Sequence, residues 1–143
     1  MITNERQHGI TKRRISEFQA ALATSEPIDG VDPVLHEAVL ASYRWQIEQM
    51  EQELARYDAL KRGEIAHAEF TSLRDLPIAL IEARIASGLN QAQLADRLNL
   101  AEQQIQRYEK NLYAGANLDR LQAVADALNV RIVEHVEYGV VAG

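Results

Sequence analysis

The sequence predicts a mainly α-helical protein, in which a helical hairpin with one long helix precedes a bundle of four or five short helices, with one or two short strands. Two observations predict this class. Apolar residues recur at spacings of three and four through most of the 143 residues, as in amphipathic helices. From residue 75 onward, capping residues and turn residues divide that pattern into short segments.

The first segment is expected to form a helix from about Thr11, a plausible N-cap, to Ala23. A loop rich in Pro, Gly and Asp follows. A much longer helix then begins with Asp32 as N-cap and Pro33 as its first residue, and it ends at Gly63. We expect residues 1–63 to be an N-terminal helical region that serves dimerisation or partner binding.

The long helix carries apolar residues at alternating spacings of three and four, a pattern typical of a heptad seam. The seam residues are Leu40, Tyr43, Ile47, Met50, Leu54 and Tyr57. So short a first helix is not expected to cover this seam alone. Some of the seam is therefore expected to face the second half of the chain, a second copy or another protein. An antiparallel hairpin with self-dimerisation is favoured over a different partner.

Two segments have some strand character. Residues 64–74 are expected to form a linker with one short strand, and β-branched residues in the 131–143 tail favour another. Such strands could pair within one chain or across a dimer.

Short helices are predicted between residues 75 and 130. Asp75 caps the first, which stops at Gly88, and Asn90 caps the second. Asn99 lies where the chain must turn sharply, and Asn tolerates the left-handed conformation that such a turn requires. Residues 75–130 are therefore expected to form a helical bundle that contains a helix-turn-helix.

The helix expected over residues 102–110 buries only Ile105 and Tyr108 and leaves a polar side outward. Glutamine pairs in a bidentate manner with adenine, and arginine with guanine, in the major groove of DNA. This side is therefore expected to read base edges. The alternative is a bundle of the same core that binds only protein, and the glutamine- and arginine-rich character of the exposed side favours DNA.

The segment "LIEARIASGLNQAQLADRLNLAEQQIQRYEKN…LDRLQAVADALNV" resembles the XRE family of Cro/cI-type repressor domains over about residues 75–130. Glycine is usual in that family in the turn and after the third helix. Here those positions hold Asn99 and Asn111, and asparagine is the commonest other residue for the same backbone.

The resemblance implies a set of DNA contacts. In such domains bases are read from the start of the third helix, which corresponds here to Glu102, Gln103, Gln104, Gln106 and Arg107. Phosphates are bound from the start of the second helix and the loop after the third, which corresponds to Asn90, Gln91, Lys110, Asn111 and Tyr113.

Such domains normally bind palindromic operators as two-fold dimers, with half-sites about one helical turn apart. An acidic helical extension before the domain also resembles the HigA-like antitoxins of toxin–antitoxin pairs. That resemblance implies repression of its own operon and binding of a small basic ribonuclease toxin. The alternatives are an autonomous dimeric repressor without a toxin and a protein-binding adaptor.

Charge and composition constrain these alternatives. The net charge is −6, and residues 1–75 hold nine Lys and Arg against thirteen Asp and Glu, so any DNA contact in the second half must use a local patch.

Enzymatic function is not expected. The chain has no cysteine, and its four histidines are scattered, so no thiolate nucleophile and no histidine pair of helical spacing exists. Cofactor and metal sites are not expected either. No membrane-length apolar run and no signal peptide is apparent, which indicates a cytoplasmic protein.

Overall fold

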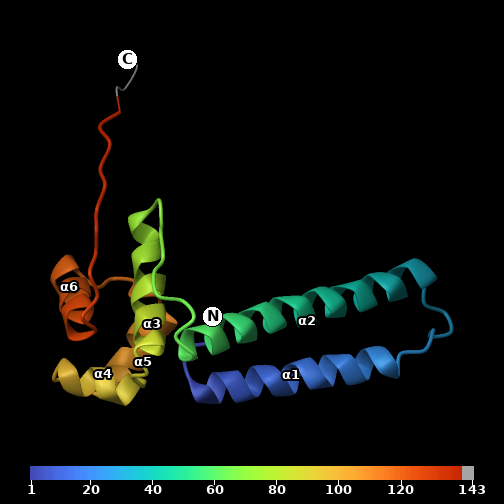
Figure 1. Cartoon of the computed structure of the whole chain (residues 1–143). Coiled ribbons are helices and arrows are strands. Elements are labelled where there is room, and N and C mark those ends of the chain that lie inside the picture. Colours follow the sequence, from blue (N-terminus) through green and yellow to red (C-terminus); the bar gives the residue numbers. More distant parts are fainter. Residues whose placement is uncertain (140–143) are drawn as a thin grey trace.

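The computed structural model describes residues 1–139, whose regular structure is entirely helical (Figure 1). A hairpin of two long helices projects from a bundle of four short ones. The elements are α1 (Glu5–Ala23), α2 (Pro33–Lys61), the 3-10 turn η1 (Leu73–Asp75), α3 (Leu76–Ala86), α4 (Gln91–Arg97), α5 (Glu102–Lys110) and α6 (Leu118–Ala127). The predicted mainly helical class is confirmed.

Helix α1 begins earlier than the sequence suggested. Its N-cap is Asn4, whose side-chain oxygen accepts a hydrogen bond from the backbone N–H of Gln7 at 2.9 Å. The predicted start near Thr11 is wrong, because Asn4 already satisfies the first turn and the acidic Glu5 complements the helix N-terminus.

The expected ends of α2 are confirmed. The side chain of Asp32 accepts from the backbone N–H of Val34 at 2.9 Å, and Pro33 occupies the first turn, where its missing N–H costs nothing. After Lys61, Gly63 adopts a φ of 71°, which glycine tolerates without steric penalty.

The heptad seam of α2 lies against α1 and the bundle. Ile47 and Tyr57 are buried and the other four seam residues are half-buried. The rings of Phe18 and Tyr43 pack at 5.1 Å between centroids, and Ile15 is buried in α1. Helix α1 has 19 residues and covers part of the seam, while Leu54 and Tyr57 pack in the core that α2 shares with the bundle.

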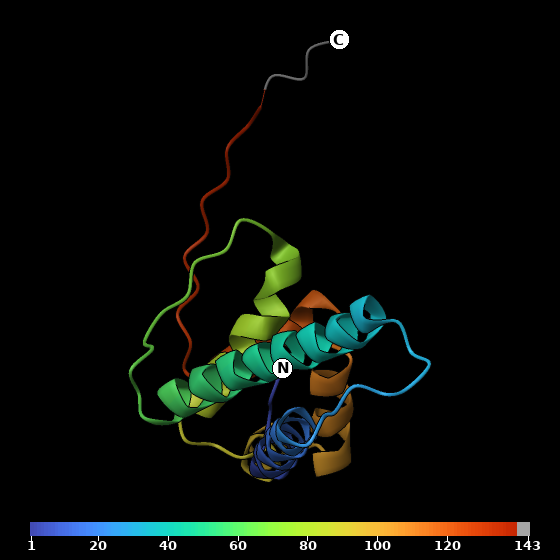
Figure 2. The same ribbon diagram turned by 90° about the vertical axis from the view of Figure 1, so that its right-hand side faces the viewer.

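One hydrophobic core joins the bundle to the base of the hairpin. Its fully buried members come from four bundle helices: Leu80, Ile81, Leu94, Ile105 and Val124. Ile2, Tyr57 and Leu60 belong to the same cluster. Figure 2, seen from the tip of the hairpin, shows the bundle behind the hairpin. The hairpin is thus anchored to the bundle at one end and extends away from it at the other.

The two predicted short strands are absent from the described residues. Residues 64–72 and 131–139 have no ladder partner, and the second segment leads away from the bundle in both views (Figures 1 and 2). Local pattern alone was the basis of these predictions, namely alternation in the linker and β-branched and aromatic residues in the tail. An isolated strand without a neighbour leaves its backbone groups to water. The last four residues of the predicted tail strand, 140–143, lie outside the described residues.

Candidate nucleic-acid interface

Helices α4 and α5 are joined by a tight turn with well-defined caps. The side-chain oxygen of Asn90 accepts from the N–H of Gln93 at 2.8 Å, and the side-chain oxygen of Gln93 accepts from the N–H of Asn90 at 2.9 Å. This reciprocal capping box fixes the start of α4. At the turn, Asn99 has the predicted left-handed backbone, with a φ of 54°. The N–H of Leu100 then donates to the carbonyl of Ala95 at 2.9 Å, which closes the turn.

Helix α5 has one buried side and one exposed side. Ile105 is fully buried and Glu109 is 2% exposed. The five residues that the resemblance assigns to base reading are all exposed: Glu102, Gln103, Gln104, Gln106 and Arg107. The fold therefore brings this predicted set together on one accessible surface.

Two glutamines of this set are engaged by the helix itself. Gln104 accepts from the backbone N–H of Ala101 at 3.1 Å, and Gln106 donates to the Glu102 carboxylate at 3.1 Å. Within residues 1–139, no hydrogen bond or ion pair involves the side chains of Gln103 and Arg107. These two side chains are thus free to contact a ligand without breaking an internal bond.

The five residues assigned to phosphate contacts are divided by burial. Asn90, Lys110 and Asn111 are exposed, whereas Gln91 is 5% and Tyr113 3% exposed. The amide of Gln91 donates to Glu109 at 2.8 Å and accepts from Asn4 at 3.1 Å. Phosphate contact from position 91 would therefore use its backbone N–H.

Tyr113 packs inside the bundle. Its ring stacks on Tyr108 with centroids 5.3 Å apart and planes inclined by 4°. Burial raises its pKa, and its hydroxyl has no hydrogen-bond partner among the described residues. The position thus contributes to packing in this conformation.

The turn after α5 departs from the expected backbone. Asn111 has a φ of −96°, so the prediction that it takes a glycine-like conformation is wrong. The left-handed backbone with positive φ occurs instead at Leu112, Tyr113 and Gly115, with φ of 49°, 54° and 78°. The chain reverses one residue later because the Tyr113 N–H donates to the Tyr108 carbonyl at 2.7 Å.

A buried ion pair holds α5 in place. The Arg84 guanidinium donates to both carboxylate oxygens of Glu109, at 2.5 and 2.8 Å. It also donates to the Leu89 carbonyl at 2.8 Å and to the Thr3 carbonyl at 2.5 Å. Arg84 and Glu109 are 3% and 2% exposed. With Gln91, this network connects α3, α4, α5 and the N-terminal segment.

Sequence reasoning missed this network. A signal existed, because Glu109 lies four residues after Ile105 and therefore on the buried side of α5. A carboxylate at a core position requires a cationic partner. Arg84 lies among the apolar residues of α3 in the same way.

Polar contacts also fix the base of the hairpin. The Tyr57 hydroxyl donates to Glu5 at 3.0 Å, and Lys61 pairs with the same carboxylate at 3.0 Å. The Lys61 and Tyr57 contacts lower the pKa of Glu5, while burial and the Glu5 contact raise the pKa of Tyr57 to about 12. Arg56 donates to Glu82 of α3 through two bonds of 2.8 and 2.7 Å.

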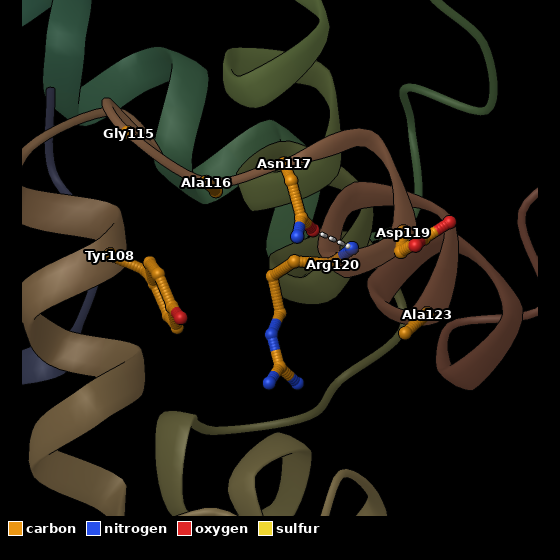
Figure 3. Close-up of a pocket in the computed structure, with 7 residues that line it drawn as sticks. All are labelled: Tyr108, Gly115, Ala116, Asn117, Asp119, Arg120 and Ala123. Atoms are coloured by element: carbon orange, nitrogen blue, oxygen red, sulfur yellow. Dashed lines mark hydrogen bonds between the residues drawn. The ribbon is translucent and has the colours of Figure 1, made fainter.

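An open groove lies where α5 meets the start of α6 (Figure 3). The Arg120 guanidinium faces the Tyr108 ring across it, 6.0 Å from the ring centroid. Asn117 caps α6 by accepting from the Arg120 N–H at 2.9 Å. The groove places a cation beside the end of α5, and the acidic Asp119 also lines it.

Residues 80–135 match the family model described as helix-turn-helix. These residues are therefore similar to helix-turn-helix domains of the XRE type. The match starts within α3 and extends past α6, so it contains the whole α4–turn–α5 unit. Domains of this kind belong to DNA-binding transcription regulators and are not catalytic. Searches of curated proteins and of solved structures gave no match.

Two further features of residues 1–139 bear on other kinds of site. None of their helices combines the length and apolar character that crossing a bilayer requires. No group of three or more acidic or histidine side chains is placed there to hold a metal ion.

Proposed function

We propose that this protein is a sequence-specific, DNA-binding transcriptional repressor that reads its operator with the exposed side of α5. The observation that carries the proposal is the pair Gln103 and Arg107, which are exposed and unengaged on the second helix of a helix-turn-helix. Their guanidinium and amide groups can each make the bidentate base contacts that give discrimination in the major groove.

The remaining residues have supporting roles in this proposal. Glu102 and Gln106 hydrogen-bond one another and can accept from cytosine or donate to a base edge after rearrangement. Gln104 holds the N-terminus of α5. Lys110, with Asn90 and Asn111, would contact phosphates, which sets affinity but carries no sequence information.

The overall acidity of the chain is compatible with this role because it is concentrated away from the domain. Residues 76–130 carry five Lys and Arg against six Asp and Glu, and the Arg84–Glu109 pair is buried. DNA would therefore meet the local cations Arg107 and Lys110. Because only these two local cations meet the DNA, we expect the protein to bind non-specific DNA weakly. Base contacts should then supply a large part of the affinity for the operator.

Assembly as a two-fold dimer on a palindromic operator is part of the proposal. A symmetric dimer presents two copies of α5 to two half-sites, which multiplies the specificity of one short helix. Such a repressor would act in the cytoplasm.

A second candidate role is that of an antitoxin, which would also bind a small basic ribonuclease. The observation that favours it is the hairpin, which projects from the DNA-binding bundle (Figure 1) and belongs to the acidic half of the chain. The acidic excess of the hairpin lies in α2 and in the loop before it, since α1 carries four Lys and Arg against two Asp and Glu. Such an acidic surface is complementary to a basic protein and speeds its association. Pull-down of the tagged chain should then recover one small basic partner in stoichiometric amount.

The DNA-binding proposal is tested by selecting bound duplexes from a randomised pool and then measuring variants on the selected sequence. Arg107→Ala should cost about 1–3 kcal/mol and relax one base position. Lys110→Ala should weaken all sequences alike and reduce the salt slope by about one. Arg13→Ala, an equal charge change on the exposed part of α1, is the matched control and should bind as the parent does. Parent-like binding by both Arg107→Ala and Lys110→Ala would refute the assignment of α5.

A further inference from the structure

A second apolar stripe runs along α2 on the side that does not face α1. Val34, Ala38, Ala41 and Trp45 follow spacings of four, three and four, which is a heptad pattern distinct from the seam. Val34 is 76% and Trp45 61% exposed, and both alanines are exposed too. Leu35, at 59% exposed, widens the stripe.

Exposure on this scale is unusual for a helix of a folded chain. Isolated apolar side chains are common on protein surfaces, but contiguous ones at heptad spacing mark an interaction surface. The stripe is on the distal half of the hairpin, which projects away from the bundle (Figure 1). Nothing within residues 1–139 covers it.

The stripe is complementary to itself in size when two copies run antiparallel. If Ala38 of one copy lies beside Ala41 of the other, Trp45 lies beside Val34. The two alanine layers at the centre then let the helices approach closely, and the larger side chains fill the two ends.

The flanking charges are complementary in the same register. Glu37 and Arg44 lie along one edge of the stripe and contact one another within the chain at 3.0 Å, with side chains 64% and 56% exposed. In the antiparallel pair, Glu37 of each copy faces Arg44 of the other. A parallel pair lacks this match, because its edge positions would pair Glu37 with Ser42 and Arg44 with Gln49.

We infer that this stripe is the surface on which two copies of the chain pair, antiparallel and two-fold symmetric. The inference deepens the proposed function, since it rests on the two-fold assembly stated there. The symmetry axis crosses α2 at the level between Val39 and Leu40 along the helix, midway between Ala38 and Ala41. An interface of about three helical turns is small, so pairing should fall in the micromolar range.

This pairing has a consequence for the operator. From the symmetry axis to Leu60, where α2 enters the core of the bundle, about 20 residues rise roughly 31 Å. The two bundles are therefore attached about 60 Å apart. That separation is closer to two turns of DNA than to the single turn expected for such domains.

The surface is tested by measuring the mass of the full chain by light scattering, above and below micromolar concentration. The parent should form a dimer, and Ala41→Glu should remain a monomer with unchanged helicity because it places a charge in the centre of the stripe. Ala20→Glu, an equal change on the exposed side of α1, should dimerise as the parent does. A monomeric parent, or a dimeric Ala41→Glu variant, would overturn the inference.

The register is tested by charge reversal. Glu37→Arg alone and Arg44→Glu alone should each weaken pairing about ten-fold, because two attractive contacts become repulsive. Mixing the two variants in equal amounts should restore parent affinity, because every contact between chains is again of opposite charge. Within each chain of the mixture, positions 37 and 44 still carry like charges and repel. A recovered pairing affinity therefore reports only the contacts between the two copies. Absence of recovery would refute the antiparallel register.

DNA binding separates this inference from the proposed function. If Ala41→Glu is monomeric and still prefers a single half-site, both stand. If the parent dimerises through the stripe but selects no sequence, the proposed function fails and the surface stands. If the parent selects a sequence while Ala41→Glu remains dimeric, the surface fails and the function stands.

Discussion

Replacing Arg84 with methionine tests whether the buried network positions α5. The substitution keeps much of the side-chain volume but removes the guanidinium, which makes four hydrogen bonds of 2.5 to 2.8 Å. Glu109, at 2% exposed, would retain only the amide of Gln91 as a donor. The carbonyls of Thr3 and Leu89 would lose their side-chain donor as well.

An uncompensated buried charge of this kind costs about 3–5 kcal/mol. The total stability of a domain is only about 5–15 kcal/mol, so a large part of it would be lost. With a urea dependence of about 1–3 kcal/mol per molar, the midpoint of urea unfolding should fall by roughly 2 M. Far-UV circular dichroism follows the transition in both proteins.

The matched control is Arg56→Met, which breaks a bidentate pair between a side chain that is 49% exposed and the Glu82 side chain, which is 12% exposed. Its cost should be smaller, about 1 kcal/mol, because water reaches this pair through the Arg56 side and screens it. The double variant Arg84→Met/Glu109→Met should recover much of the loss, since no unpaired charge remains. The reasoning is refuted if Arg84→Met lowers the free energy of unfolding no more than Arg56→Met does. It is also refuted if the double variant loses as much stability as the single variants Arg84→Met and Glu109→Met lose when added together.

Three further predictions follow from buried or strained positions. Ile47→Asp should destabilise the hairpin by about 3 kcal/mol, because Ile47 is 8% exposed, and unchanged urea unfolding and helicity would contradict its burial. Asn99→Ala should cost about 1–2 kcal/mol and Asn99→Gly nearly nothing, because the φ of 54° disfavours a β-carbon; equal thermal midpoints would contradict this. The pKa of Tyr57 is raised from 10.0 to about 12, so its contribution to stability is present below pH 10 and lost as the pH rises to about 12. Tyr57→Phe should therefore show a weaker loss of stability over that pH interval, measured by urea unfolding at each pH, and an identical pH dependence would exclude this role.

Much of the bundle could be predicted from sequence because its signals are local. The caps at Asp32 and Asn90 and the turn at Asn99 each depend on one residue and its immediate neighbours. The helix-turn-helix identification has the same origin, and the match over residues 80–135 confirms it.

The errors arose where local preference was ambiguous. Asn4 and Thr11 are both acceptable N-caps, and only the structure shows that Asn4 is used. Asn111 is a residue type that suits a left-handed turn, but the left-handed backbone begins one residue later, where the Tyr113 N–H bonds to the Tyr108 carbonyl. The tail has the residue types of a strand, but no partner strand exists within the described residues.

The sequence by itself determined the helical segments, their caps and the polar exposed side of α5, because a helix's period and its ends are encoded by residues a few positions apart. Only the tertiary structure decided which apolar residues of α2 are covered, because that depends on where α1 and the bundle lie. It also decided that Arg84 meets Glu109, 25 residues away, in a site closed to water. Long-range pairing of this kind is a property of packing in three dimensions, which no local pattern specifies.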